Sequence, residues 1–293
     1  FFAAYRRKGG AEMYLVDRYK AHMDKIAADG LTFVTPSGEE LLTGFTTAAT
    51  AAEIGKMDMV ILMVKATQTE DIMPTLAPCM SDSTVVVSLQ NGLGNDEVLQ
   101  KYVSADRILY GFGTIGTELP EPGKCVSKPE SGVIMRFGAV EKCEASEKAG
   151  KALEKLFNDG GCETVFEEDI RPFVWKKAIS NSGYNTLSAL LRLKVGFILD
   201  SDEGCELIKR IWSEGCDVAQ AVTGVDLWPD MELELPRLKE GFADYYPSMA
   251  QDVLMHHRQT EVKLLNGAIA DYGRLYGVDT PVNDAVTLMV GAI

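Results

Sequence analysis

The sequence contains few of the residues that build metal sites and disulfide frameworks. Among its 293 residues there are only three histidines and six cysteines. No two cysteines form a C-x-x-C pair, and no two histidines have the H-E-x-x-H spacing of a zinc-binding helix. We therefore expect no metal site, and we expect the cysteines to be reduced and mostly buried thiols.

Basic charge and long apolar runs are also scarce. The chain has 29 Lys and Arg residues against 43 Asp and Glu residues, a formal net charge of −14, and a negative field of this kind repels nucleic acid and anionic membranes. No segment reaches the roughly 18 apolar residues of a membrane span, and the opening FFAAYRRKGG lacks the order of a signal peptide. These absences predict a cytoplasmic protein whose partner is a small molecule, with no nucleic acid and no membrane.

The first part of the chain alternates short apolar runs with helical patterns, which indicates a parallel sheet with crossover helices. Strands are expected at 12–17, 31–35, 57–64, 84–89, 107–110 and 133–137, and helices at 19–29 and 144–157. Three prolines, Pro120, Pro122 and Pro129, predict an irregular stretch.

From about residue 169 the pattern changes to long helical periods. Helices are expected at 171–191, 206–222, 251–257, 261–276 and 285–293. The segment WPDMELELPR, with Pro229 and Pro236, is expected to be a loop. The sequence therefore predicts an α/β fold with two domains: a Rossmann-like dinucleotide-binding domain over residues 1–165, and an all-helical domain for substrate binding and dimerisation over residues 166–293.

The literal G-x-G-x-x-G of the sequence, residues 111–116, is not expected to bind a dinucleotide. Such a motif requires a helix to begin at the glycine turn, and the prolines of the following TELPEPGK prevent one. Instead, FFAAYRRKGG has the character of the end of a first crossover helix. We therefore expect the first strand and the pyrophosphate loop of the Rossmann domain to lie upstream of Phe1.

Two further features indicate where a dinucleotide and its substrate would bind. Asp17 closes the strand at 12–17, where a Rossmann domain places the acceptor for the adenosine ribose hydroxyls. The adjacent Arg18 could bind a 2′-phosphate, so the choice between NADPH and NADH stays open, and Asp17 could equally be an ordinary surface residue. Asn91, in the QNGLGN turn after the strand at 84–89, offers a donor and an acceptor to a substrate or nicotinamide, although an Asn-Gly turn is also chosen for its backbone angles alone.

A polar stripe marks the helix expected at 171–191. Lys177, Asn181, Asn185 and Ser188 recur at spacings of four, four and three, so they project from one face of a helix that is otherwise largely apolar. An amine and carboxamides on such a face suit a ligand site, in which Lys177 could stabilise and protonate the carbonyl oxygen of a 2-oxo acid during its reduction. The alternative is a solvent-facing helix with a snorkelling lysine.

The segments EMYLVDR, VKATQTED, SLQNGLGNDE, WKKAISNSGYNTLSAL and SMAQDVLMHHRQTEVKLLNG together resemble the ketopantoate reductase family through nearly the whole chain. The resemblance implies an NADPH- or NADH-dependent reduction of 2-dehydropantoate to pantoate, a step of pantothenate and coenzyme A biosynthesis. It implies that Lys177 is the general acid. The implied binding residues are Asn181, Asn185, Ser248 and Asn91 for the substrate, with Lys65, Asn91 and Glu261 where the cofactor meets it.

Besides its missing first strand, the chain departs from the family pattern at three places. It has Asn185-Thr186-Leu187-Ser188 where many members have Asn-Pro-Leu-Thr, and Val195 where some members have an asparagine. It is also one residue longer between Asp252 and Glu261. Helix capping is the alternative role for both Ser248 and Glu261. The alternative functions are a 3-hydroxy acid dehydrogenase and a non-catalytic nucleotide-sensing relative, and a homodimer is the expected assembly.

Overall fold

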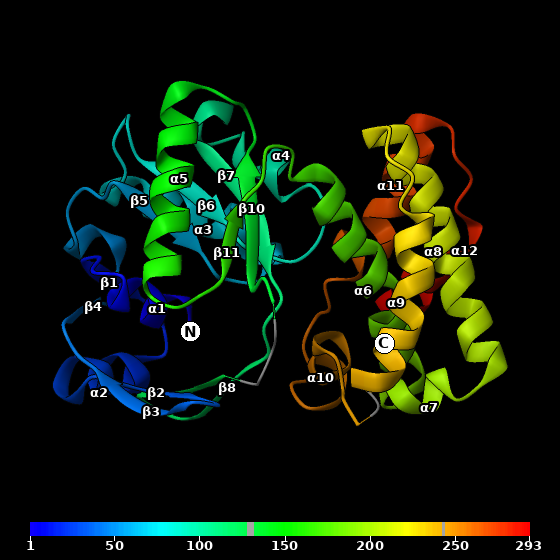
Figure 1. Cartoon of the computed structure of the whole chain (residues 1–293), viewed down its shortest axis with the longest axis horizontal. Coiled ribbons are helices and arrows are strands. Elements are labelled where there is room, and N and C mark those ends of the chain that lie inside the picture. Colours follow the sequence, from blue (N-terminus) through cyan, green and yellow to red (C-terminus); the bar gives the residue numbers. More distant parts are fainter. Residues whose placement is uncertain (128–131, 242–243) are drawn as a thin grey trace. The chain divides into compact units, whose positions relative to one another are not determined.

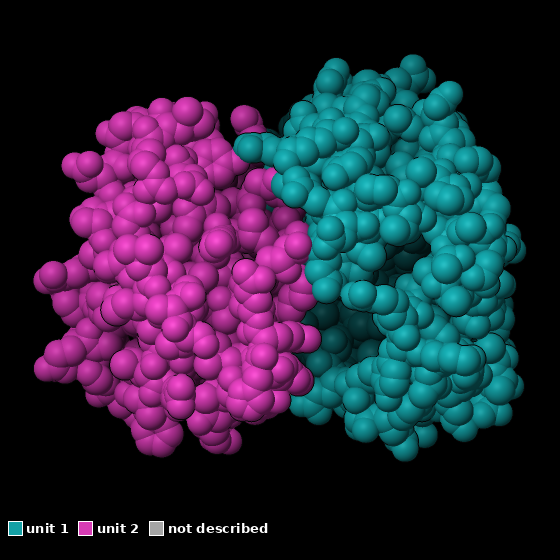
Figure 2. Space-filling model, turned by 180° about the vertical axis from the view of Figure 1, so that it is seen from behind, with its two compact units in different colours: residues 1–64, 68–90, 96–170 teal, residues 65–67, 91–95, 171–293 magenta. Residues whose placement is uncertain are grey.

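The computed structural model describes residues 1–127, 132–241 and 244–293, in two compact units that Figure 2 colours separately. Unit 1 comprises Phe1–Val64, Gln68–Gln90 and Asp96–Ile170, and unit 2 comprises Lys65–Thr67, Asn91–Asn95 and Arg171–Ile293. The main change between units thus falls at Ile170, and two short loops that follow strands of unit 1 belong to unit 2. The domain boundary between residues 165 and 166 stays a proposal.

The described residues of unit 1 form three sheets. The largest has the order β11-β10-β7-β6-β5, in which β5, β6 and β7 are parallel and β10 runs antiparallel to β7. Its strands are β5 (Met59–Leu62), β6 (Val85–Ser88), β7 (Ile108–Gly113), β10 (Met135–Ala139) and β11 (Thr164–Phe166). The parallel, doubly covered strands confirm the Rossmann-type fold expected from the apolar runs.

Strand β6 shows how these residues build the core. Val86 and Val87 are consecutive, so their side chains point to opposite faces of the sheet, and both are fully buried. Val86 packs in a cluster with Met73 of α3 (Thr69–Leu76), and Val87 in a cluster with Phe157 of α5 (Glu144–Asp159). Figure 1 shows α5 lying across one face of this sheet. The strand is therefore apolar on both sides because both sides are covered.

The smaller sheets of unit 1 were only partly expected. β1 (Met13–Val16) pairs in parallel with β4 (Phe45–Ala48), and β4 was not anticipated. Among the described residues β1 pairs with β4 alone, and the strand expected upstream of Phe1 stays a prediction. The four-stranded sheet has the order β3-β2-β9-β8, with strands β3 (Gly38–Leu42), β2 (Leu31–Thr35), β9 (Lys124–Ser127) and β8 (Thr117–Glu121).

The expectation of an irregular stretch at Pro120 is wrong, because Pro120 lies in β8. β8 is at the edge of its sheet, the position where a proline without an N–H is tolerated. Pro122 does lie in the turn before β9, and Pro129 lies outside the described residues.

Gly111 lies in β7, where a Cβ atom would come within 2.1 Å of the Arg136 carbonyl oxygen, so this glycine allows the close packing of β7 against β10.

Outside the helices of unit 2 given below, the described residues also form the helices α1 (Phe2–Lys8), α2 (Lys20–Asp29) and α4 (Asn95–Leu99), with the 3-10 turns η1 (Ala51–Glu53), η2 (Ala66–Gln68), η3 (Ala77–Cys79), η4 (Ala105–Arg107) and η5 (Val262–Leu264). α4 begins at the last residue of a unit 2 loop, and η5 belongs to unit 2.

The described residues of unit 2 form helices joined by turns and loops, with no strand among them. Its helices are α6 (Arg171–Leu191), α7 (Val195–Leu199), α8 (Asp202–Thr223), α9 (Trp228–Gly241), α10 (Ser248–Leu254), α11 (Asn266–Tyr276) and α12 (Pro281–Gly291). α6 contacts α7, α8, α9, α10 and α12, and Figure 1 shows the long helices lying side by side. α6 is therefore surrounded by other helices, which explains why even its asparagines are buried.

The expectation of a loop at WPDMELELPR is wrong, because α9 covers it. Pro229 is in the first turn, where its missing N–H would have no partner in the helix. Pro236 lies inside the helix and removes one hydrogen bond, which the burial of Met231 and Leu238 offsets. The helix expected at 251–257 instead ends at Leu254, and that expected at 261–276 is a 3-10 turn followed by α11.

Candidate active site

A pocket lies entirely within unit 2. Most of its wall is polar, although the helices around it are largely apolar. Its lining residues are Asn91, Asn181, Asn185, Ser248, Met249, Asp252, Glu261 and Leu265. The structure therefore brings together residues that are as much as 174 positions apart in the sequence, from Asn91 to Leu265.

Two carboxamides on successive turns of α6 form one wall of the pocket. Asn181 and Asn185 are 6% and 5% exposed. The Asn181 Oδ1 atom accepts a hydrogen bond of 2.9 Å from the Tyr184 hydroxyl. The Asn185 Oδ1 atom is buried and has no hydrogen-bond partner. Since leaving a buried acceptor unpaired costs about 1–3 kcal/mol, this oxygen suits a ligand that brings a donor.

The other two residues of the predicted stripe lie outside this lining. Lys177 is half-buried on α6, one turn before Asn181, and is not among the lining residues that the described part of the chain supplies. Ser188 is fully buried and donates to the Leu193 carbonyl oxygen, so its hydroxyl satisfies the backbone beyond the end of α6. The stripe is a ligand-facing surface at Asn181 and Asn185 and a structural one at Ser188.

The turn that carries Asn91 is held by its own backbone. Gly92 has a φ of +99°, and a Cβ atom at this position would come within 2.8 Å of Leu264. Next to it, the Leu93 N–H donates to the Leu264 carbonyl oxygen over 2.9 Å, and Asn95 Nδ2 donates to the Asn91 carbonyl oxygen over 3.0 Å. The glycine is thus required by both conformation and close approach, and the result is a fixed position for Asn91.

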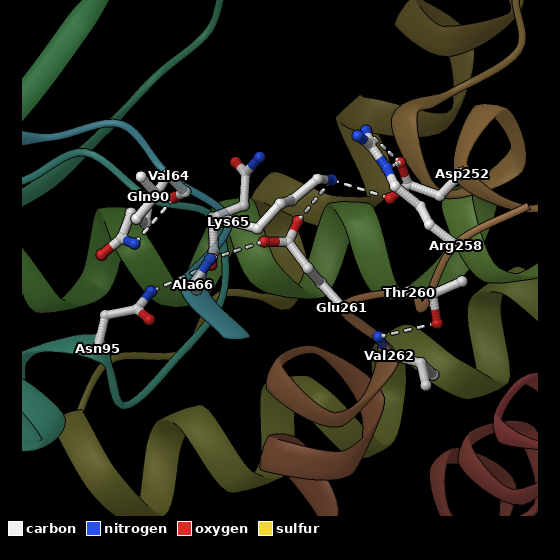
Figure 3. A network of polar contacts seen from close by, with 11 residues as sticks. Val64, Lys65, Ala66, Gln90, Asn95, Asp252, Arg258, Thr260, Glu261 and Val262 are labelled. Atoms are coloured by element: carbon white, nitrogen blue, oxygen red, sulfur yellow. Dashed lines mark hydrogen bonds and ion pairs between the residues drawn. The ribbon is translucent and has the colours of Figure 1, made fainter. Parts of the chain in front are cut away.

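A network of two cations and two carboxylates adjoins the pocket (Figure 3). The Lys65 ammonium lies between Asp252 Oδ2, at 2.8 Å, and Glu261 Oε2, at 3.3 Å. Glu261 Oε1 accepts from the Ala66 N–H over 3.1 Å, and Asp252 Oδ1 accepts from Arg258 Nε over 2.6 Å. The opposite charges cancel, which is the condition for keeping such groups away from water.

The segment between Asp252 and Glu261 forms a compact turn. α10 ends at Leu254, His257 adopts a φ of +48°, and the Arg258 N–H donates to the Asp252 carbonyl oxygen over 3.1 Å. This compact turn leaves Glu261 in the pocket wall. Neither Glu261 nor Ser248 forms a side-chain capping bond at the start of its own helix.

Asp252 is a site residue that sequence reasoning missed. Its side chain is 2% exposed, lines the pocket and bonds to both Lys65 and Arg258. The signal that could have found it is its spacing: it follows Ser248 by four residues, so both lie on one face of α10.

The predicted cofactor residues Asp17 and Arg18 belong to unit 1. Both are exposed and follow the carboxyl end of β1. Asp17 Oδ1 accepts from the Tyr19 N–H over 2.7 Å, which fixes the carboxylate at the start of α2. An exposed carboxylate at the end of a parallel strand fits the ribose of a dinucleotide.

A unit with a largely parallel sheet, followed by a helical unit with an amide-lined pocket, is compatible with a dinucleotide-dependent oxidoreductase. The chain matches the family description "Ketopantoate reductase PanE/ApbA" over residues 1–141 and "Ketopantoate reductase PanE/ApbA C terminal" over residues 169–293. The chain belongs to the ketopantoate reductase family.

Individual relatives agree with this assignment. A 2-dehydropantoate 2-reductase of Pyrococcus horikoshii is 30% identical over 284 residues, covering 97% of this chain and 90% of that protein. A ketopantoate reductase structure from Ralstonia eutropha has a TM-score of 0.86 at 25% identity, covering 99% of this chain and 93% of the other. A ternary structure of D-mandelate dehydrogenase with NADH and anilino(oxo)acetate has a TM-score of 0.86 at 26% identity, with the same coverage.

Two absences among the described residues concern membranes and metal ions. No helix among them is long and apolar enough to cross a membrane. They also contain no group of three or more His, Cys, Asp or Glu side chains that could hold a metal ion.

Proposed function

We propose that this enzyme reduces 2-dehydropantoate to pantoate with NADPH or NADH, and that the substrate binds in the pocket of unit 2. The single observation that carries the choice of substrate is the unpartnered, buried Asn185 Oδ1. 2-Dehydropantoate has a carboxylate and a 2-oxo group, which accept hydrogen bonds, and a C4 hydroxyl, which can donate one. Asn185 Oδ1 suits that hydroxyl, and the amide of Asn181 and the hydroxyl of Ser248 suit the acceptor groups.

The reaction adds a hydride to C2 and a proton to the C2 oxygen, so that the ketone becomes a secondary alcohol. When bound, the reduced nicotinamide supplies the hydride. Lys177 donates the proton to the C2 oxygen, and its positive charge stabilises the negative charge that develops there. Asn181, Asn185 and Ser248 hold the substrate without adding a competing charge, and the buried wall of the pocket strengthens these contacts by excluding water.

The residues proposed to hold the cofactor fit its parts. Asp17 would accept from the adenosine ribose hydroxyls, and Arg18 would bind a 2′-phosphate if one is present. Lys65, Asn91 and Glu261 are proposed to act near the nicotinamide end. Lys65 and Glu261 already neutralise each other, so they offer polar atoms without a net charge.

A second candidate is the reduction of an aromatic 2-oxo acid. It is favoured by the likeness to D-mandelate dehydrogenase, whose structure contains NADH and anilino(oxo)acetate. The mostly polar lining of the pocket favours a hydroxylated acid over a phenyl ring. The 3-hydroxy acid dehydrogenase alternative requires a different substrate class, and the non-catalytic alternative requires no turnover.

A substrate panel separates these alternatives. Oxidation of NADPH and of NADH is followed with 2-dehydropantoate, benzoylformate and a 3-oxo acid as substrates. We expect the highest kcat/KM with 2-dehydropantoate. A higher kcat/KM with benzoylformate would support reduction of an aromatic 2-oxo acid. Turnover of the 3-oxo acid alone would support a 3-hydroxy acid dehydrogenase. No turnover of any acid would overturn the proposal.

The expectations of a cytoplasmic location and a homodimer stay predictions. The six free cysteines, four of them buried, suit a reducing compartment. Several apolar side chains of α11 and α12 are exposed, including Leu275 and Leu288, and would suit a subunit interface.

A further inference from the structure

The Asn181 side chain is held by a neighbour on its own helix. Tyr184 follows Asn181 by three residues on α6, so their side chains lie on adjacent turns of the same face. The Tyr184 hydroxyl donates to Asn181 Oδ1 over 2.9 Å. Tyr184 is half-buried and is not among the residues that line the pocket. Tyr184 therefore holds a residue of the pocket wall without being part of that wall itself.

In the structure this contact occupies the acceptor end of the carboxamide and leaves its donor end for a ligand. An asparagine amide presents an acceptor oxygen at one end and two N–H donors at the other. With Oδ1 bonded to a hydroxyl, Nδ2 keeps its donors for the pocket. Rotating the amide by half a turn would bring Nδ2 to the Tyr184 hydroxyl, which would then have to turn and accept instead of donating, and would place an acceptor oxygen where a carboxylate or oxo oxygen would bind. Because Asn181 is only 6% exposed, little water is present to stabilise that second orientation.

The next asparagine along α6 has the opposite polarity. Asn185 lies one turn later, and its buried Oδ1 has no hydrogen-bond partner. Successive turns of one helix thus offer a donor from Asn181 and an acceptor from Asn185. A ligand that carries an anionic or carbonyl oxygen and a hydroxyl can accept from Asn181 and donate to Asn185. Two freely rotating amides would not distinguish such a ligand from one with two acceptors.

We propose that Tyr184 is a positioning residue for substrate binding: its hydroxyl fixes the Asn181 amide with Nδ2 directed as a donor to the substrate. The proposal rests on the proposed function for the identity of the substrate, and on the Tyr184 to Asn181 contact for its physical basis. The Tyr184 hydroxyl orients the Asn181 amide and does not react itself. Loss of this hydroxyl therefore weakens binding of the 2-oxo acid and leaves the chemical groups of the reaction in place.

Steady-state kinetics of Tyr184→Phe test the proposal. The variant keeps the ring and removes only the hydroxyl. We expect the KM for 2-dehydropantoate to rise about 3- to 10-fold, the usual effect of one neutral hydrogen bond, with kcat within about twofold of the parent. The KM for the cofactor should not change. Tyr276→Phe, an exposed tyrosine of α11 in the same unit, is the matched control and should behave as the parent.

A double-mutant cycle separates positioning from general packing. In an Asn181→Ala background the Tyr184 hydroxyl has no amide to orient, so Tyr184→Phe should then change the KM by less than about twofold. An undiminished 3- to 10-fold effect in that background would overturn the proposal, because it would show that the hydroxyl acts elsewhere.

A measurement independent of turnover distinguishes this proposal from the proposed function. The side-chain amide resonances of Asn181, identified by their absence in Asn181→Asp, should shift or broaden in Tyr184→Phe and stay unchanged in Tyr276→Phe. Unchanged resonances in Tyr184→Phe would overturn the positioning role. Failure of the parent enzyme to reduce 2-dehydropantoate would overturn the proposed function and leave this spectroscopic result to decide the role of Tyr184.

Discussion

Lys176 and Lys177 are neighbours on α6 with different surroundings. Lys176 pairs with Asp230 at 3.2 Å, whereas Lys177 precedes Asn181 by one turn and shares its helix face. We predict that Lys177→Ala lowers kcat by roughly 10²-fold or more, as expected for loss of a positioned proton donor, with folding and cofactor affinity nearly unchanged. Lys176→Ala is the matched control and should keep kcat within a few-fold. Rapid turnover by Lys177→Ala would remove this lysine from catalysis.

Asp252 should contribute to the free energy of unfolding, because its buried carboxylate neutralises part of the charge of both Lys65 and Arg258. Asp252→Asn leaves Lys65 and Arg258 opposite the single carboxylate of Glu261. We expect the free energy of unfolding to fall by about 1–3 kcal/mol, less than for a fully buried pair because Arg258 is half-exposed and screened by solvent.

Urea unfolding measures this loss. The matched control is Asp271→Asn, whose exposed carboxylate pairs with Arg274 on the surface of α11 and should contribute at most about 1 kcal/mol. Equal losses in the two variants would argue that the Asp252 network contributes no more than a surface ion pair.

At the residue scale, helical spacing predicted part of the site. It placed Asn181 and Asn185 on one face, and the structure shows both in the pocket wall. The same spacing included Ser188, which bonds to the backbone beyond the helix end. The spacing of residues does not predict where a helix ends, or that a hydroxyl near its end donates to a backbone carbonyl oxygen. It also could not reveal that Tyr184 bonds to Asn181, because that depends on side-chain rotamers.

At the scale of elements, α9 shows why proline alone is a poor predictor of a loop. The segment has Met231 and Leu238 seven residues apart, two helical turns, and both are buried. Packing of this stripe outweighs the hydrogen bond that Pro236 removes. The helix at 171–191 was predicted with its observed bounds, because its apolar pattern continues without such a competing signal.

Helix α2 and the β8–β9 turn are linked by a pH-sensitive contact. The Gly123 N–H donates to His22 Nδ1 over 2.8 Å, which requires a neutral imidazole. Burial lowers the pKa of His22 below its ordinary value of 6.5. The unfolded chain therefore binds a proton before the folded one does, so this contribution to stability is present above about pH 6.5 and is lost as the pH falls below it.

Urea unfolding of the parent and of His22→Gln between pH 5 and 8 tests this sign. The difference in unfolding free energy between the two proteins should shrink as the pH falls through the ordinary His range. A difference that is constant with pH, or that grows in acid, would show that folding does not lower the pKa of His22.

At the scale of the whole molecule, the chain order of the two units was readable from the change in hydrophobic period near residue 169. The assignment of the loops 65–67 and 91–95 to unit 2 was not. It depends on contacts between residues far apart in the sequence, such as the Ala66 N–H with Glu261 and the Leu93 N–H with Leu264. Local patterns carry no information on such pairs, so the composition of the pocket became visible only in the structure.

The central claim is that the pocket recognises a 2-oxo acid through its hydroxyl as well as its carboxylate. The most direct test compares kcat/KM for 2-dehydropantoate and for 3,3-dimethyl-2-oxobutanoate, which lacks only the C4 hydroxyl, in the parent and in Asn185→Leu. We predict a preference of about 10- to 100-fold for 2-dehydropantoate in the parent, because the analogue leaves Asn185 Oδ1 unpaired, and nearly equal values in the variant. Equal values in the parent, or an unchanged preference in Asn185→Leu, would contradict the account.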